Sequence, residues 1–186
     1  MTVATGCRRG ELLALTWTDV DFDHGVVDVS KSLEQTREGL RIKTTKTGKS
    51  RAIPIPRFAI EELKEHRSNQ NHWLGMFKGD YRSDLDLVIS TPEGNYLKPD
   101  SVTTKVCLLA RSVGLKASLH TLRHSHASEL LSKGVPLPTV SKRLGHSSVN
   151  VTAKVYSHSF SADEIRAAEV IDTVLRNVVQ REELKN

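Results

Sequence analysis

Two histidines, an arginine and a tyrosine towards the end of the chain are the residue types that a phosphoryl-transfer site needs. The sequence HTLRH covers residues 120–124, the sequence LGH ends at His146, and Tyr156 follows ten residues later. Imidazole, guanidinium and phenol groups can hold a phosphodiester and attack its phosphorus. No metal-binding motif accompanies them. Such a site therefore has to neutralise the phosphate with its own arginines and lysines.

The spacing of these residues indicates what each could do. His120 and Arg123 are three residues apart, so a helix would place both on one face. Arg123 could offer two donors to one phosphate, and Arg8, close to a predicted helix start, could offer two more. Tyr156 needs a base or a strongly cationic site, because a phenol with a pKa of about 10 is a poor nucleophile. His120 is the better acid/base candidate, whereas His146 follows a glycine at a helix end and is suited to donate a hydrogen bond to the phosphate.

A basic segment upstream could supply further positive charge. Its sequence TKTGKSR contains Lys46, Lys49 and Arg51, and GKS predicts a turn between two extended strands. At the tip of such a hairpin, an ammonium group on a flexible side chain could protonate the leaving oxygen of a phosphodiester. Either Lys46 or Lys49 could occupy the tip, and a hairpin whose lysines are merely solvated is the alternative.

The elements that must position these residues predict a mostly helical α+β fold, with a small three-stranded antiparallel sheet near the N-terminus. A short helix covers residues 10–15, where Glu11 is expected to anchor the helix or an arginine through a salt bridge. Alternation and β-branched residues predict the three strands, in residues 25–33, 39–46 and 51–56, with a further short strand in 86–90. Apolar spacing and capping residues predict the later helices, in residues 58–67, 101–113, 119–134, 136–146, 147–158 and 162–179.

Composition narrows the class of protein. A length of 186 residues fits one domain with a helical appendage. A net charge of +5 is compatible with a polyanionic partner, and the absence of a long apolar run argues against a membrane protein. Cys7 and Cys107 are far apart and in no CxxC spacing, which argues against a disulfide framework or a zinc site and favours a reducing, cytoplasmic setting. The sequence predicts neither a cofactor nor a metal.

Four motifs together resemble a known family. They are ATGCRRGELLALTW, TKTGKSRAIPIP, HTLRHSHAS and LGHSSVNVTAKVYSH, and they are similar to the motifs of the tyrosine recombinase, or phage integrase, catalytic domain, in the family's order and over most of the chain. A five-residue HxLRH pattern can occur by chance, whereas the joint occurrence is specific. On this resemblance the catalytic residues are Arg8, Lys46, His120, Arg123, His146 and Tyr156.

The resemblance implies a metal-independent enzyme that cleaves and rejoins double-stranded DNA, encoded by bacteria or phages and used in the recombination or integration of mobile genetic elements. Tyr156 would attack a phosphodiester, form a 3′-phosphotyrosyl intermediate and free a 5′-hydroxyl, and the partner strand would later reverse the step. The family's pattern also favours Lys46 over Lys49 as the hairpin lysine. A non-catalytic DNA-binding module and a type IB topoisomerase-like enzyme are the alternatives.

Two parts of the chain are expected to have different tasks. Residues 1–160 are predicted to form the catalytic domain, and residues 161–186 a C-terminal helix. Family members usually carry a helix and one or two DNA-binding domains before the first arginine motif, and only seven residues precede Arg8, so the chain is interpreted as the catalytic half of a larger protein. The C-terminal helix could fold back on its own domain or dock on a neighbouring protomer, as the family's tail commonly does. The resemblance thus implies a homo-oligomer, a tetramer on DNA.

Overall fold

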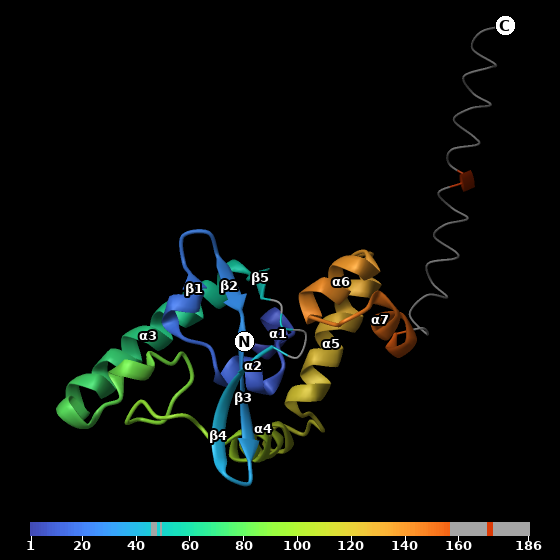
Figure 1. Cartoon of the computed structure of the whole chain (residues 1–186). Helices are drawn as coiled ribbons and strands as arrows, with labels where there is room; N and C mark the ends of the chain where they lie inside the picture. Colours follow the sequence, from blue (N-terminus) through green and yellow to red (C-terminus); the bar gives the residue numbers. More distant parts are fainter. Residues whose placement is uncertain (46–47, 49, 157–170, 173–186) are drawn as a thin grey trace, which may run out of the picture.

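The computed structural model describes residues 1–45, 48, 50–156 and 171–172. Within this part the predicted α+β class is confirmed, because helices predominate and two small antiparallel sheets lie in the first third of the chain (Figure 1). The helices are α1 (Thr2–Thr5), α2 (Arg9–Leu13), α3 (Arg57–Phe77), α4 (Pro99–Ser112), α5 (Leu119–Ser132), α6 (Leu137–Leu144) and α7 (Val149–Val155). The strands are β1 (Val20–Asp21), β2 (Val26–Val29), β3 (Lys31–Thr36), β4 (Gly39–Thr44) and β5 (Arg51–Pro54).

The predicted pairing of three strands in one sheet is wrong. A three-stranded sheet does exist, in the order β1-β2-β5, but β3 and β4 form a separate two-stranded hairpin. The segment 25–33 divides at Ser30, and its two halves bury side chains against different clusters. Val27 and Val29 of β2 face the main core, whereas Leu33 of β3 packs against α2. Because the two halves bury their side chains in different clusters, the segment does not continue as a single strand of one sheet.

Helix α3 ends ten residues beyond the predicted helix, because a polar side chain is buried inside the stretch that was expected to end it. Gln70 accepts a hydrogen bond from Nε1 of Trp17 at 2.7 Å and donates one to the carbonyl of Leu87 at 3.0 Å. The predicted strand at 86–90 is also wrong. Its residues form only the isolated bridges Thr16 to Leu87 and Ser90 to Tyr96. The hydrogen bonds of Gln70 therefore hold this extended segment against α3.

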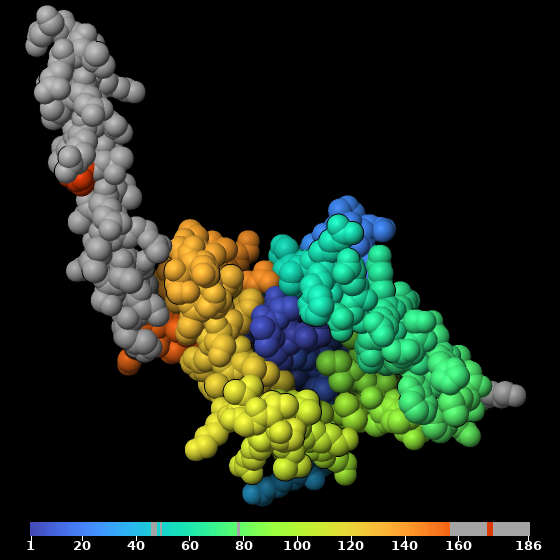
Figure 2. All heavy atoms as spheres, turned by 180° about the vertical axis from the view of Figure 1, so that it is seen from behind, coloured from blue at the N-terminus to red at the C-terminus, as the bar shows by residue number. Residues whose placement is uncertain are grey.

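Two apolar clusters flank the N-terminal segment. One lies between the three-stranded sheet and α3 and includes Val27, Ile53 and Leu63, and the other joins α5, α6 and the end of α7. Helix α1 packs against α5, and in Figure 2 the dark blue N-terminal segment is visible between the yellow α5 and the green α3. Helix α1 and the residues directly after it therefore lie between the sheet region and the helical region and contact both.

The predicted helices that follow residue 100 are confirmed as far as Val155, within one or two residues of most expected ends. The predicted C-terminal helix, and with it residues 161–186 as a docking tail, lies outside the described residues except for Ile171 and Asp172. Among the described helices, none combines the length and the hydropathy that crossing a bilayer requires.

Candidate active site

An open cavity of about 730 Å³ collects most of the residues that the sequence singled out. Its wall is formed by the start of α2, the β3–β4 hairpin, the start of α5 and the end of α7. Five of the six predicted site residues line it: Arg8, His120, Arg123, His146 and Tyr156. The sixth, Lys46, lies outside the described residues.

Arg8 is fixed at the point where α2 begins. Its backbone is extended, so it acts as the N-cap, and its N–H donates to Oε2 of Glu11 at 2.8 Å. Its Nη1 donates to Oε1 of the same carboxylate at 3.0 Å, and its Nη2 donates to the carbonyl of Gly145 at 3.1 Å. One arginine therefore ties the start of the chain to the end of α6.

Glu11 holds a second arginine from the opposite side. Nη1 and Nη2 of Arg51 donate to its two carboxylate oxygens at 3.1 and 2.7 Å, while Nε of Arg51 donates to the carbonyl of Arg143 at 2.9 Å. The exposed fractions of the Glu11 and Arg51 side chains are only 2% and 8%. Burial alone would raise the pKa of Glu11, but the hydrogen bonds and charges of Arg51 and Arg8 outweigh it and hold this pKa below its usual range. Glu11 was predicted to anchor its helix or an arginine, and in the structure it does both.

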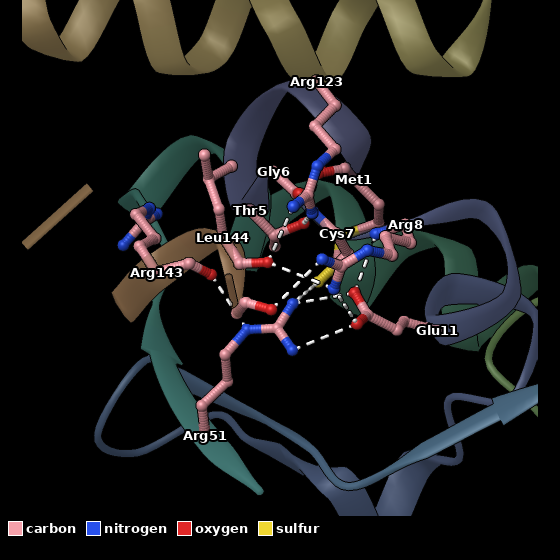
Figure 3. Close-up of polar contacts among 11 residues, drawn as sticks. Met1, Thr5, Gly6, Cys7, Arg8, Glu11, Arg51, Arg123, Arg143 and Leu144 are labelled. Atoms are coloured by element: carbon pink, nitrogen blue, oxygen red, sulfur yellow. Dashed lines mark hydrogen bonds and ion pairs between the residues drawn. The ribbon is translucent and has the colours of Figure 1, made fainter. Parts of the chain in front are cut away.

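Arg123 completes a cluster of three guanidinium groups around this carboxylate (Figure 3). It is only 6% exposed, and it donates to the carbonyl of Gly6 and, at 2.8 Å, to that of Leu144. Burial and the neighbouring charge of Arg8 lower its pKa to about 10. The positive charge of the cluster exceeds what Glu11 can neutralise, so an anion in the cavity would be favoured.

Gly145 makes the close approach of these groups possible. It ends α6 in the left-handed conformation, with φ of 66°, and this turns the last carbonyls of the helix towards Arg8 and Arg123. A Cβ atom at this position would lie 2.7 Å from Nη1 of Arg51. Glycine is therefore required both by the backbone angle and by the arginine beneath it.

His146 is held as a neutral imidazole next to the cluster. Its Nδ1 lies 2.7 Å from Oγ1 of Thr152, a buried residue of α7. Burial, reinforced by the charges of Arg123, Arg8 and Arg51, lowers the pKa of His146 to about 4. At neutral pH this side chain can give or take a hydrogen bond in the cavity without adding a charge.

Tyr156 contacts His124 rather than His120. Its side chain packs in the α5–α6 cluster and is only 3% exposed, and its hydroxyl lies 3.0 Å from Nδ1 of His124. Burial raises the pKa of Tyr156, and the charge of Arg123 opposes this shift. His120 is exposed and lies one step further out, with its Nε2 at 2.9 Å from Nε2 of His124. The sequence predicted His120 as the acid/base residue, whereas in the structure His124 lies between His120 and Tyr156.

The residues that form this cavity lie within a segment that matches a known protein family. The model of the phage integrase family matches residues 1–163. The chain belongs to this family. It is a tyrosine recombinase catalytic domain, with the first arginine motif at α2 and the tyrosine at the end of α7.

Individual relatives agree with this placement. The chain is 32% identical over 185 residues to a XerC-like tyrosine recombinase of Caldanaerobacter subterraneus, covering 92% of this chain and 47% of the relative. It is also 32% identical over 160 residues to the integrase of Staphylococcus phage L54a, covering 83% of this chain and 45% of that protein. The integrase-family chain thus spans about half the length of the curated relatives it matches.

Solved structures give the same fold. The Tn1549 transposon integrase bound to transposon right end DNA superimposes with a TM-score of 0.73 at 21% identity, over 90% of this chain and 56% of that one. The XerH site-specific recombinase, in a post-cleavage complex with a palindromic difH substrate, superimposes with a TM-score of 0.63 at 28% identity, over 92% of this chain and 44% of that one.

Two residues of the candidate site were not predicted from the sequence. His124 was assigned no role in the chemistry from the sequence, although its four-residue spacing from His120 places the two on one helical face. Arg51 was counted among the basic residues of a hairpin, and its position at the start of an apolar strand was the available sign of burial. No three metal-ligand side chains gather at a site in the part of the chain that the structure describes.

Proposed function

We propose that this chain is the catalytic part of a site-specific DNA recombinase that uses Tyr156 as its nucleophile. Tyr156 attacks a phosphodiester of double-stranded DNA, which forms a 3′-phosphotyrosyl link and releases a 5′-hydroxyl. Arg8 and Arg123 neutralise the nonbridging oxygens, and His146 donates a hydrogen bond to them. His120 serves acid/base transfer, and Lys46 protonates the departing oxygen. Attack by a free 5′-hydroxyl of the partner strand then rejoins the DNA.

The observation that carries the proposal is the meeting of Tyr156 with an excess of positive charge in one cavity. Arg8 and Arg123 both hydrogen bond to the carbonyl of Leu144, so their guanidinium groups stand side by side although the residues are far apart in sequence. A purely structural arginine pair would be neutralised by carboxylates. Here Glu11 is shared with Arg51, and the remaining charge faces the cavity that the tyrosine lines.

The finer organisation is part of the same proposal. We propose that residues 1–160 form the catalytic domain of a tetramer on DNA. We propose that residues 161–186 form a helix that folds back on its own domain or docks on a neighbouring protomer. Structures of relatives support assembly on DNA, since the XerH recombinase was solved on its difH substrate and a lambda integrase fragment as a dimer on a core site. The relatives are mainly bacterial and phage proteins, and we place this chain in the bacterial cytoplasm.

Covalent trapping tests the nucleophile directly. The protein is incubated with a pool of nicked DNA duplexes of randomised sequence, because the nick lets the released strand diffuse away and leaves the enzyme attached. Denaturing gels should show protein joined to DNA, and peptide mapping should place the link on Tyr156. Tyr156→Phe should abolish the adduct, with Tyr96→Phe as the matched control that keeps it.

Other results would favour the alternative functions. Salt-sensitive DNA binding by the wild-type protein without any adduct would indicate a non-catalytic binding module. Adducts formed equally on all sequences of the pool, with relaxation of supercoiled plasmid, would indicate a topoisomerase-like enzyme. An adduct that persists in Tyr156→Phe would overturn the assignment of the nucleophile.

A further inference from the structure

His124 occupies the space between the tyrosine and the exposed His120. The Tyr156 hydroxyl lies 3.0 Å from Nδ1 of His124, and Nε2 of His124 lies 2.9 Å from Nε2 of His120. Both distances are those of hydrogen bonds. If the phenol donates to Nδ1, then Nε2 of His124 carries the proton and donates to His120. The reverse assignment, with His120 donating to Nε2 of His124 and Nδ1–H of His124 donating to the phenol oxygen, would also satisfy both contacts. Only the first directs the phenol proton at an acceptor.

We propose that His124 is a further catalytic residue, which takes the proton of Tyr156 during attack and passes a proton on to His120. The inference rests on the proposed function, because it assigns a step of that reaction. It also changes the role of His120 from the direct base to the outer member of a relay.

The proposed step balances in atoms and charge. The phenol oxygen forms a bond to phosphorus while the bond from phosphorus to the 5′ oxygen breaks. The phenol proton moves to Nδ1 of His124, and the Nε2 proton of His124 moves to Nε2 of His120. His120 becomes an imidazolium that can release its proton to water, because it is exposed. The departing 5′ oxygen receives a separate proton, assigned above to Lys46.

The surroundings of His124 suit this transfer. Burial, with the nearby His120 and Arg123, lowers the pKa of His124, so the imidazole is neutral at rest and has a free acceptor. Burial raises the pKa of Tyr156, so the phenol keeps its proton until an adjacent base accepts it. The other charged or titratable residues that line the described cavity are Cys7, Arg8, Arg9, Glu34, Lys43 and His146. The positive charge of Arg123 favours the phenolate of Tyr156 as it forms.

The tautomer can be measured without DNA. Nitrogen-15 spectra at neutral pH should show His124 with an unprotonated Nδ1 and a protonated Nε2, and the signals should be assigned by their loss in His124→Asn. A His124 that carries its proton on Nδ1 would overturn the inference, because such a ring cannot accept the phenol proton.

Cleavage kinetics provide the second test. The substrate is the nicked duplex that reacts best with wild-type protein in the randomised pool. His124→Asn keeps a hydrogen-bonding group near the phenol but cannot take its proton, so its cleavage rate at neutral pH should fall about 10²-fold. The loss should shrink as the pH rises and hydroxide removes the phenol proton. His124→Phe, which removes the hydrogen bond to the phenol as well, should reduce the cleavage rate by a similar factor. His72→Asn changes an exposed histidine on α3 and should leave the cleavage rate at the wild-type value.

Failure of the relay differs from failure of the proposed function. If wild-type protein traps DNA through Tyr156 and His124→Asn cleaves as fast at every pH, the relay is wrong and the function stands. If the loss in His124→Asn is the same at every pH, His124 only positions the tyrosine and the relay is again wrong. If no variant and no wild-type protein forms an adduct, the function itself fails.

Discussion

The two sides of the cavity differ in the charge of their side chains, because one side carries arginines and the other carries neutral histidines next to the tyrosine. On the arginine side, Arg8, Arg51 and Arg123 carry permanent charge and are locked to Glu11 and to backbone carbonyls. On the tyrosine side, His124 and His146 are held neutral by burial and by those same charges. A phosphate needs fixed charge, whereas a nucleophile needs a group whose proton can move. The arginine charges thus act on both sides, since they can bind the phosphate and also lower the pKa of the neighbouring imidazoles.

The largest expected effect comes from removing charge on the arginine side. Arg123→Ala should slow DNA cleavage by about 10³-fold, because it deletes a phosphate donor, the donor to the carbonyl of Gly6 and one of the two donors to the carbonyl of Leu144. Single-turnover cleavage of the selected nicked duplex measures the effect. Arg123→Lys keeps the charge without the planar pair of donors, so its cleavage rate should lie between those of the wild-type protein and Arg123→Ala. An Ala variant that cleaves at nearly the wild-type rate would remove Arg123 from the site.

The shared carboxylate should dominate the stability of this side. Glu11→Gln leaves Arg51 buried without its charged partner and should lower the free energy of unfolding by about 3 kcal/mol. Urea unfolding at neutral pH measures the change.

Glu34→Gln is the matched control, because Glu34 pairs with Arg41 and Lys43 on the exposed hairpin. It should cost less than about 1 kcal/mol. Equal costs for the two variants would contradict the view that the Glu11 pair is a buried structural element and not a surface contact.

A smaller effect is expected where the two sides join. Gly145→Ala should lower the free energy of unfolding by about 2 kcal/mol, from its left-handed backbone and from the close contact with Arg51. Gly114→Ala is the control, since it has a similar φ and no described atom within 4 Å of the added Cβ. Thermal unfolding of both variants isolates the contact with Arg51. Identical losses would show that only the backbone angle matters.

The smallest effect belongs to the tyrosine side and depends on pH. His146 has its pKa lowered to about 4 by burial and by the arginines, from an ordinary value of 6.5. Between these values the unfolded chain binds more protons than the folded one, so stability should fall as the pH drops from 6.5 towards 4. His146→Asn should make this fall shallower in urea titrations at several pH values. An unchanged slope would mean that His146 binds protons equally in the folded and unfolded states, so that folding does not lower its pKa.

The sequence predicted the members of the site better than their contacts. Motif spacing was enough to single out Arg8, Arg123 and Tyr156, because the chemistry of a phosphodiester limits the residue types. It could not show that Tyr156 contacts His124 rather than His120, since both lie on one face of α5 and the choice depends on how α7 packs against that helix.

The errors in the fold have similar physical causes. Alternation predicted extended segments correctly but could not show which strands pair, because β2 and β3 bury their side chains against different clusters. The end of α3 was misplaced because Gln70 is satisfied by Trp17 and Leu87, contacts that propensity does not include. In both cases a tertiary contact overrode the local pattern.

The link between Arg8 and Gly145 has a consequence for how the protein is made. These residues are 137 positions apart, and synthesis proceeds from the N-terminus. Arg8 therefore leaves the ribosome before Gly145 and has no helix end to bind until α6 has followed it. Until then Arg8, Arg51 and Glu11 can pair, but the pocket for the phosphate is open on one side. The arginine cluster therefore reaches its described arrangement only after α6 has been synthesised.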